Sequence, residues 1–251
     1  MTSSTRSIRT GACAALLLLA AGAARAQAHS SAGIENFGYE LVDLDPADGV
    51  TPSLTLTLTD IYGETDLYLG SFSYPTTQAS TNTFGKIHVE NAYGSGSAAL
   101  APDYGSSSAA DAEAYSARSG TRLDLQFDLS PHTRVIFSAD AAVSAQPVHG
   151  FTYAEAGLHG EITTPFISHG TRFDAVDYTY LGDESGVLSA VANAGDTATT
   201  GTLSIRTSAS SESFTPPVPE PPAVAMLGGG LVLVAGAAHR RRRARTLTAS
   251  A

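Results

Sequence analysis

The sequence has little of several residues on which common protein functions depend. It contains one cysteine, Cys13, and no tryptophan in 251 residues. Cys13 lies in an apolar run near the N-terminus, so the rest of the chain offers no disulfide, no thiolate nucleophile and no cysteine ligand for a metal. Without tryptophan, the side chain with the largest aromatic surface for contact with a sugar ring is also missing.

Basic residues are scarce away from the two ends of the chain. Eight of the 14 lysines and arginines lie in the first 25 or the last 12 residues, which leaves six in the interior. Residues 27–219 hold these six basic residues and 23 of the 24 acidic residues, so their formal net charge is −17. Such a surface repels phosphate backbones, and we therefore expect no nucleic-acid binding by the main body.

The N-terminal residues have the pattern of a secretory signal peptide. Arg6 and Arg9 precede a short apolar run with four consecutive leucines, and small residues at Ala24 and Ala26 offer cleavage sites after it. The apolar run is too short for a membrane-spanning helix, which needs about 20 residues. We therefore expect residues 1–26 to be removed on export, with the mature protein outside the cytoplasm.

A three-part pattern occupies the C-terminus, after a Ser/Thr/Pro-rich linker at residues 207–217. Its parts are the motif Val218, Pro219, Glu220, Pro221; the apolar segment 223–238; and the cluster Arg240, Arg241, Arg242, Arg243, followed by a tail, 244–251. This order resembles the PEP-CTERM sorting signal of bacterial surface proteins associated with exopolysaccharide. The resemblance implies recognition and processing by an integral-membrane exosortase, with these residues as its substrate.

The physical chemistry of this C-terminus agrees with a temporary membrane anchor. The prolines lack amide donors and fix φ, so the motif stays extended. The apolar segment of 16 residues spans about 24 Å as a helix, slightly less than a hydrocarbon core of about 30 Å. The arginines favour the cytoplasmic side of the inner membrane. A permanent tail anchor is the alternative to processing.

Alternating apolar and polar residues between the two ends predict strands. Leu123, Leu125, Phe127 and Leu129 alternate with polar residues, as a half-buried strand requires. No sustained helical period occurs, so we expect an all-β fold, a single antiparallel β-sandwich of jelly-roll type over residues 27–206. Residues 91–121 are rich in Gly, Ser and Ala, and we expect them to form a long surface loop.

Two sets of residues suggest metal chemistry. His149, His159 and His169 recur every ten residues, each before a glycine, and imidazoles gathered at one sheet edge suit zinc or copper. Turns recur at the same spacing, so we favour a structural role and predict no cofactor. A second set, Asp43, Asp45 and Asp48 before Gly49, is similar to a calcium loop but lacks its closing glutamate, which again favours a turn.

No sequence motif of a hydrolase, a metalloprotease or a nucleotide-binding enzyme is present. A carboxylate pair for glycoside hydrolysis remains an alternative, because such a pair needs only to meet in space. Tyrosines offer a further possibility, since their rings stack on pyranose rings. The candidates are Tyr62, Tyr68, Tyr74, Tyr178 and Tyr180.

The sequence thus predicts an exported, non-enzymatic protein of the cell surface or extracellular matrix. Its expected partners are an exosortase-type membrane enzyme and exopolysaccharide, with a transient stay in the inner membrane. A carbohydrate-binding or carbohydrate-hydrolysing β-sandwich is the alternative, and a metal-dependent module built on the His-Gly series is a third hypothesis.

Overall fold

The computed structural model describes residues 27–69, 75–113, 115–148, 150–163 and 170–213. All of them lie in one compact unit, residues 26–216. The described part is built from strands and turns, and it contains no helix of the length and apolarity needed to cross a membrane. The predicted signal peptide, sorting motif, apolar segment and arginine cluster lie outside the described residues.

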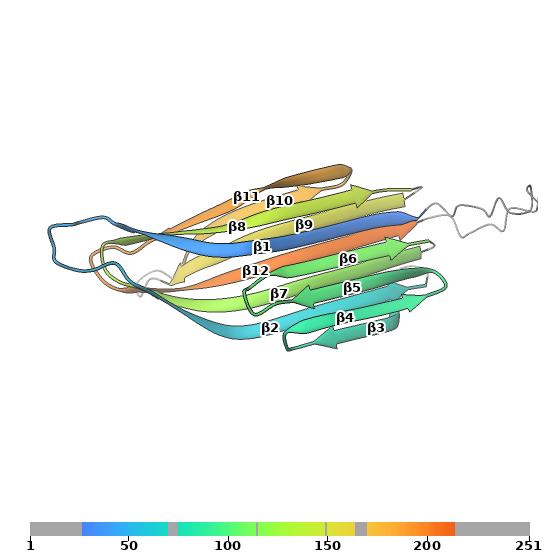
Figure 1. The fold of residues 1–251 in the computed structure, drawn as a ribbon, viewed down its shortest axis with the longest axis horizontal. Coiled ribbons are helices and arrows are strands. Elements are labelled where there is room, and N and C mark those ends of the chain that lie inside the picture. Colours follow the sequence, from blue (N-terminus) through green and yellow to red (C-terminus); the bar gives the residue numbers. More distant parts are fainter. Residues whose placement is uncertain (1–26, 70–74, 114, 149, 164–169, 214–251) are drawn as a thin grey trace, which may run out of the picture. The chain divides into compact units, whose positions relative to one another are not determined.

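Twelve strands within the described residues form two antiparallel sheets of six strands each (Figure 1). Sheet A contains, in spatial order, β11 (Gly182–Asn193), β8 (Thr133–Gln146), β1 (Ala28–Asp43), β6 (Ser106–Ala112), β5 (Gly94–Leu100) and β4 (Gly85–Asn91). Sheet B contains β10 (Thr171–Thr179), β9 (Gly150–Thr163), β12 (Thr199–Ser213), β7 (Tyr115–Leu129), β2 (Leu54–Tyr68) and β3 (Pro75–Thr81). The prediction of an all-β, antiparallel sandwich is confirmed.

The alternation read from the sequence decides which face of each strand is buried. Leu123, Leu125, Phe127 and Leu129 on β7 are each at most 1% exposed and pack between the sheets. The polar residues between them point to the outer face of sheet B. Because β12 pairs with β7 over its whole length, the same alternation continues on β12.

One half of the sandwich has an aromatic core. Phe127 and Phe137 lie with ring centroids 5.5 Å apart, and Phe173 is 6.1–6.2 Å from both. Phe37 stacks on Phe137 at 6.2 Å. We call this half, which continues into the loop at residues 44–53, the aromatic end. Its sheets are held apart by large side chains, as in an ordinary sandwich.

The other half is filled mainly by alanine, and we call it the alanine end. Its core cluster is Ala28, Leu67, Val89, Ala110, Ala112, Ala117 and Ala209. Here serine side chains form hydrogen bonds from one sheet to the other. Ser211 on β12 donates to the carbonyl of Ala110 on β6 at 2.8 Å and lies 3.0 Å from the hydroxyl of Ser30 on β1. Ser119 on β7 donates to the carbonyl of Ser97 on β5.

The prediction of a long surface loop at residues 91–121 is wrong. This segment contains β5, β6 and the first part of β7, in which small residues alternate between buried and outward positions. Figure 1 shows these short strands gathered in the half of the body opposite the 44–53 loop. The prediction failed because Gly, Ala and Ser differ little in hydropathy. A strand that buries only small side chains therefore shows no clear alternation in the sequence.

The predicted boundary between the domain and the linker is also wrong. β12 continues to Ser213, so residues 207–213 belong to the sheet, paired with β7 on one side and β9 on the other. Their Ser and Thr residues suggested a linker, but Thr207 and Ser211 are at most 2% exposed. Only residues 214–217 of the predicted linker lie outside the described part.

Candidate ligand-binding face

The predicted histidine metal site is represented in the described residues by His159 alone, since His149 and His169 lie outside them. His159 stands on β9 at the outer face of sheet B. Its Nδ1 is 3.2 Å from a carboxylate oxygen of Asp174, and its Nε2 is 3.8 Å from one of Glu155. Among the described residues, the one cluster with metal-ligand spacing does not include His159. Glu155, followed by Asp174, raises the pKa of His159, while partial burial opposes the increase.

The surroundings of His159 contain the three residue types of a serine hydrolase, but not their geometry. Ser204 on β12 is the cross-strand partner of His159, and Asp174 on β10 lies on its other side. The Nε2 atom, however, lies near Gly157 and Glu155 rather than Ser204. Ser204 instead donates to Asp124 at 2.7 Å. Among the described residues no imidazole accepts a hydrogen bond from this hydroxyl, so the group is a polar surface network rather than a Ser-His-Asp triad.

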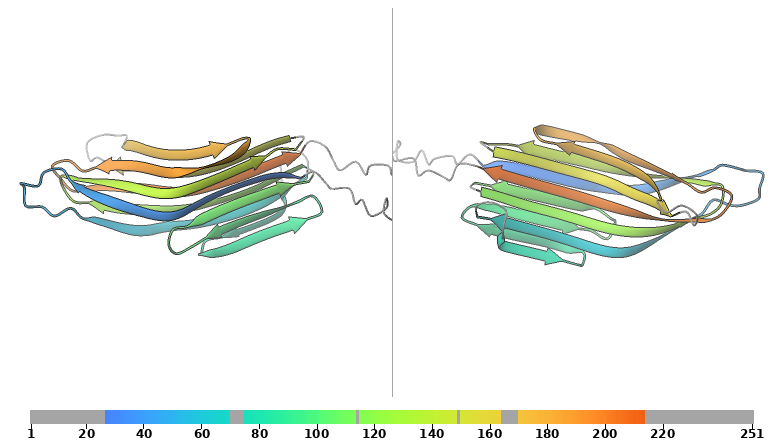
Figure 2. Two further views of the ribbon diagram at one scale, coloured as in Figure 1. Left: turned by 45° about the horizontal axis from the view of Figure 1, so that its top comes forward. Right: turned by 180° about the vertical axis from the view of Figure 1, so that it is seen from behind.

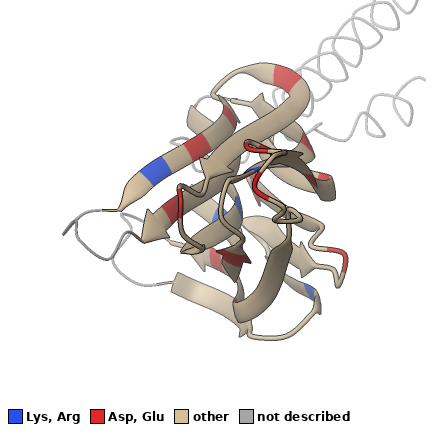
Figure 3. Cartoon of the chain, turned by 90° about the vertical axis from the view of Figure 1, so that its left-hand side faces the viewer, with Lys and Arg blue, Asp and Glu red and all other residues tan. Residues whose placement is uncertain are grey.

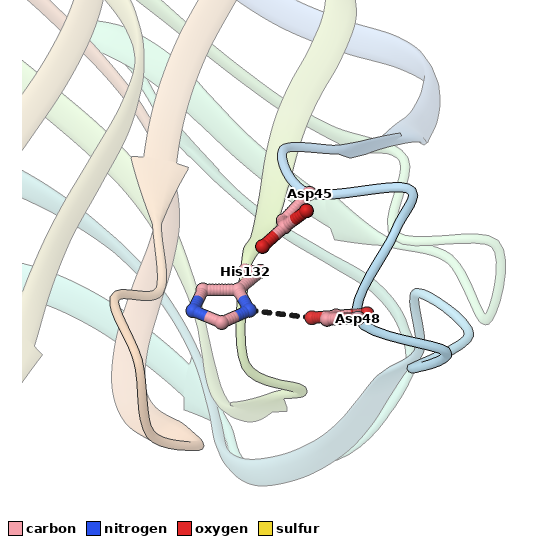
Figure 4. Close-up of side chains that lie close together, drawn as sticks. All are labelled: Asp45, Asp48 and His132. Carbon is pink, nitrogen blue, oxygen red and sulfur yellow. Dashed lines mark hydrogen bonds and ion pairs between the residues drawn. The ribbon is translucent and has the colours of Figure 1, made fainter.

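The acidic turn before Gly49 packs against the β7–β8 turn (Figure 4). Asp48 accepts a hydrogen bond from Nδ1 of His132 at 2.5 Å, and Nε2 of the same ring is 3.2 Å from Asp196. Asp45, Asp48 and His132 have ligand atoms within 4.8 Å of one another. His132 thus joins the turn at residues 43–49 to the turn at Asp196.

This cluster corresponds only in part to the predicted calcium loop. The structure brings Asp45 and Asp48 together, but Asp43 instead accepts a hydrogen bond from the amide of Asp45 and so caps the turn. Two carboxylates and an imidazole suit a transition metal better than calcium, which takes six to eight oxygen ligands. Asp48 and His132 already satisfy each other, so the arrangement stands without an ion as a salt bridge between turns.

The outer face of sheet B has a groove that we call the aromatic hollow. Its volume is about 490 Å³, within the range of roughly 300–1,000 Å³ typical of ligand pockets. The floor consists of small residues, Gly120, Ser208 and Ser210. The lining also includes side chains from β2 and β7 on one side and from β9 and the end of β10 on the other: Glu64, Asp66, Tyr68, Arg118, Phe151, Tyr153 and Tyr180. Small residues in the middle strands therefore leave a trough between rows of larger ones.

One wall of the aromatic hollow is a connected group of rings. Tyr180 lies 5.5 Å from Phe151, 5.2 Å from Tyr153 and 5.9 Å from Tyr178, measured between ring centroids. Tyr178 and Tyr180 are 54% and 50% exposed, and Phe151 is 45% exposed. The Tyr153 hydroxyl donates to the Glu155 carboxylate. These contacts hold apolar ring surface at the solvent boundary in fixed positions.

The opposite wall pairs tyrosines with carboxylates along β2. In this wall the Tyr68 hydroxyl donates to Asp66 at 3.2 Å. Tyr62, which lies on β2 outside the lining of the hollow, donates through its hydroxyl to the wall residue Glu64 at 2.7 Å. The guanidinium of Arg118 lies 5.8 Å from the centre of the Tyr68 ring. The hydrogen bond between Tyr62 and Glu64 raises the pKa of Tyr62, and burial raises the pKa of Tyr68. Both tyrosine hydroxyls therefore stay protonated and can donate hydrogen bonds. Burial also raises the pKa of Asp66.

A second groove, the polar hollow, lies on the same face. Its volume is about 630 Å³, and its lining includes Asp124, His159, Glu161, Arg172, Asp174, Thr202, Ser204 and Arg206. In the part of the chain that the structure describes, no phenylalanine or tyrosine lines it. The two hollows share β12, which runs through the middle of the sheet seen in the right-hand view of Figure 2. The face thus combines one aromatic groove with one polar groove.

Four of the predicted tyrosine candidates are brought to this single face. Tyr62 and Tyr68 lie on β2, while Tyr178 and Tyr180 belong to the opposite edge of sheet B. The fifth candidate, Tyr74, lies outside the described residues. Sequence reasoning missed the rings of residues 151 and 153 and the guanidinium of residue 118. The alternation Phe151, Tyr153, Glu155 was the available signal for the missed rings.

Charge on the body is predominantly negative. Figure 3 shows acidic positions spread over strands and turns, with few basic positions among them. Four of the six basic residues of the interior nevertheless belong to the outer face of sheet B: Arg118, Arg122, Arg172 and Arg206. Arg122 is 2.8 Å from Asp60 and 3.1 Å from Asp124, and Arg172 is 3.8 Å from Glu161. Neighbouring carboxylates therefore offset the positive charges of Arg122 and Arg172.

No protein-family model and no curated protein matches the sequence. One aligned solved structure is described as the structural basis for the promiscuous specificity of carbohydrate-binding modules from the β-sandwich superfamily. The alignment covers 70% of this chain and 95% of that one, with 11% sequence identity and a TM-score of 0.12. A likeness this low carries no argument about this chain.

Proposed function

We propose that this protein is an exported, non-enzymatic protein that binds extracellular polysaccharide on the outer face of sheet B. The observation that carries the proposal is the aromatic hollow, in which exposed rings on one side face tyrosine–carboxylate pairs on the other across a floor of Gly and Ser. Sugar rings present apolar C–H faces and polar hydroxyl edges. Aromatic faces and fixed hydrogen-bonding groups together provide contacts for both.

Export and sorting belong to the same proposal. The signal-peptide pattern of residues 1–26 would carry the body out of the cytoplasm, where polysaccharides of the cell surface are found. The C-terminal pattern at 218–243 resembles the PEP-CTERM signal, and its apolar segment at 223–238 would hold the chain in the inner membrane until an exosortase-type enzyme processes it. The body would then reach the cell surface or the extracellular matrix.

The arrangement of the carboxylates favours binding over hydrolysis. A glycosidase places two carboxyl groups on either side of the scissile bond, about 5–10 Å apart. In the aromatic hollow, Glu64 and Asp66 are two residues apart on one strand and so lie on the same wall. Each accepts a hydrogen bond from a neighbouring tyrosine hydroxyl. These bonds suit them to fix ring positions and to accept hydrogen bonds from sugar hydroxyls.

Hydrolysis is the second candidate, because burial raises the pKa of Asp66 as a general acid requires. Hydrolysis is tested directly by measuring whether the protein releases reducing sugar from neutral and uronate polysaccharides. Activity that disappears in Asp66→Asn, with polysaccharide binding retained, would replace the non-enzymatic proposal with a hydrolase. We expect no release.

The binding proposal is tested by affinity electrophoresis of the full chain, purified in mild detergent, through gels that contain single polysaccharides. We expect retardation in at least one of them. Tyr180→Ala should weaken it about tenfold, equivalent to about 1.4 kcal/mol, through the loss of ring contact. Tyr39→Ala is the matched control, since Tyr39 is 49% exposed but belongs to sheet A. Equal losses in both variants, or no retardation in any gel, would contradict the proposal.

A further inference from the structure

The two hollows on sheet B are consecutive along one strand. Thr202, Ser204 and Arg206 of β12 line the polar hollow, and Ser208 and Ser210 line the aromatic hollow. Thr207, which separates the two sets, is 2% exposed and directs its side chain inward. The outward residues from 202 to 210 therefore form one row, and the eight steps between its two ends extend about 27 Å.

Cross-strand register places the walls of the aromatic hollow beside this row. Ser208 pairs with Glu155 on one side and with Gly120 on the other, and Gly120 pairs with Glu64 of β2. Residues directly opposite each other in antiparallel strands share a face. The aromatic wall on β9 and the tyrosine–carboxylate wall on β2 therefore lie on either side of β12, three strand spacings or about 14 Å apart.

The charges that line the hollows identify the class of ligand. Carboxylates outnumber arginines: Glu64, Asp66, Asp124, Glu161 and Asp174 against Arg118, Arg172 and Arg206. Arg206 donates to the Ser204 hydroxyl at 2.8 Å, Arg172 is close to Glu161, and Arg118 is close to the Tyr68 ring. A sugar carboxylate entering the aromatic hollow would meet an excess of negative charge. A neutral sugar would find many hydrogen-bond acceptors without that repulsion.

We propose that the two hollows form one cleft that binds an internal stretch of a neutral polysaccharide chain lying along β12. This inference rests on the proposed function and adds the charge class of the polymer and the length of its contact. Stacking takes place in the aromatic hollow. In the polar hollow, Asp124, Ser204 and Arg206 exchange hydrogen bonds with the hydroxyls of further sugar units. The length of the row excludes a site built for one sugar ring.

The test compares neutral and uronate polymers with the full chain in mild detergent. Affinity electrophoresis is run in gels with a neutral glucan, a neutral galactomannan, polygalacturonate or alginate. We expect retardation by a neutral polymer and none by the two uronates. Retardation by a uronate that is lost in Tyr180→Ala would overturn the neutral class while leaving polysaccharide binding intact. Absence of retardation by all four polymers would count against the proposed function itself.

A substitution in the polar hollow tests the length of the cleft. Thr202→Arg places a long side chain on the exposed floor of the polar hollow, away from the aromatic rings. Binding of the long neutral chain should weaken at least fivefold. Short oligosaccharides of the same polymer, which fill only the aromatic hollow, should bind as they do to the unaltered protein. Ser189→Arg adds the same charge on the exposed side of β11 in sheet A and is the control.

Unfolding by the Thr202→Arg substitution is checked by comparing the melting temperatures of the two arginine variants. An unchanged affinity of correctly folded Thr202→Arg for the long chain would overturn the two-hollow cleft. Binding would then be confined to the aromatic hollow, and polysaccharide binding as such would still stand. Equal weakening by Ser189→Arg would show that the effect comes from added charge, which also contradicts the cleft.

Discussion

The aromatic end and the alanine end of the sandwich solve the same packing problem in opposite ways. At the aromatic end, Phe127 and Phe137 fill the space between the sheets. At the alanine end, buried alanines and a glycine at residue 96 bring the sheets close enough for Ser211 to donate to a carbonyl of the other sheet. The aromatic end depends on large side chains that fill the space between the sheets, whereas the alanine end depends on small side chains that let the sheets approach each other. Truncation of a side chain should therefore destabilise the aromatic end, and enlargement of a side chain should destabilise the alanine end.

Truncation should have its largest effect at the aromatic end. Phe127→Ala removes a fully buried ring that contacts two other phenylalanines. We expect the free energy of unfolding to fall by about 3–5 kcal/mol, because lost apolar contact adds to the cost of a cavity. Urea unfolding with an unchanged m-value measures this effect. A loss below about 1 kcal/mol would show that the surrounding residues collapse into the space.

Enlargement should be most harmful at the alanine end. A Cβ on residue 96 would overlap the hydroxyl of Thr65, a fully buried residue of the facing sheet. Gly96→Ala is expected to lower the free energy of unfolding by about 1–3 kcal/mol through overpacking. Gly195→Ala is the matched control, because a Cβ there has no neighbour within 4 Å and the backbone does not need a positive φ. Similar losses in the two variants would contradict close sheet contact.

Hydrogen bonds between the sheets should contribute a smaller amount. Ser211→Ala removes the donor to Ala110 and the partner of the Ser30 hydroxyl. We expect a loss of about 1–2 kcal/mol, since buried polar groups are left unpaired. Combining Ser30→Ala with Ser211→Ala should cost less than the two single losses together, because one shared bond is counted in both. Strict additivity in urea unfolding would mean that the two hydroxyls do not interact.

The smallest effect concerns the turns of the aromatic end, where His132 and Asp48 form a salt bridge. The interaction with Asp48 raises the pKa of His132, and the same bond lowers the pKa of Asp48. The histidine contribution to stability is complete below the unfolded pKa of about 6.5 and is lost as pH rises through the higher folded value. The aspartate contribution is present above about pH 4 and is lost as pH falls through its lowered folded value.

This salt bridge should therefore stabilise the fold most between about pH 4 and pH 6.5. The melting temperature of His132→Asn, whose side chain tolerates the positive φ of 50° at this position, should differ most from that of the unaltered protein in this window. Asp48→Asn should give the same profile. A difference that is constant from pH 4 to pH 9 would show that the effect does not depend on ionisation.

Sequence reasoning succeeded where residues of contrasting hydropathy alternate. On β7, Leu123 to Leu129 were predicted as a half-buried strand and are one, since Leu and Phe next to Asp and Arg leave no doubt about the buried face. It failed on β5 and β6, whose Gly, Ala and Ser residues are compatible with either face. For the candidate site, it identified four of the tyrosines that line the face but had no means of pairing β2 with the opposite edge of the sheet.

By itself, the sequence determined the fold class, the acidity of the body and the lack of cysteine beyond residue 13, because these depend on composition and on a local period of two residues. The tertiary structure alone decided that a glycine- and serine-rich segment is a strand, and that rings from residues 68 and 180 face one groove. Both outcomes depend on which strands become neighbours. Neighbours are set by contacts between residues far apart in the chain, which a local pattern does not encode.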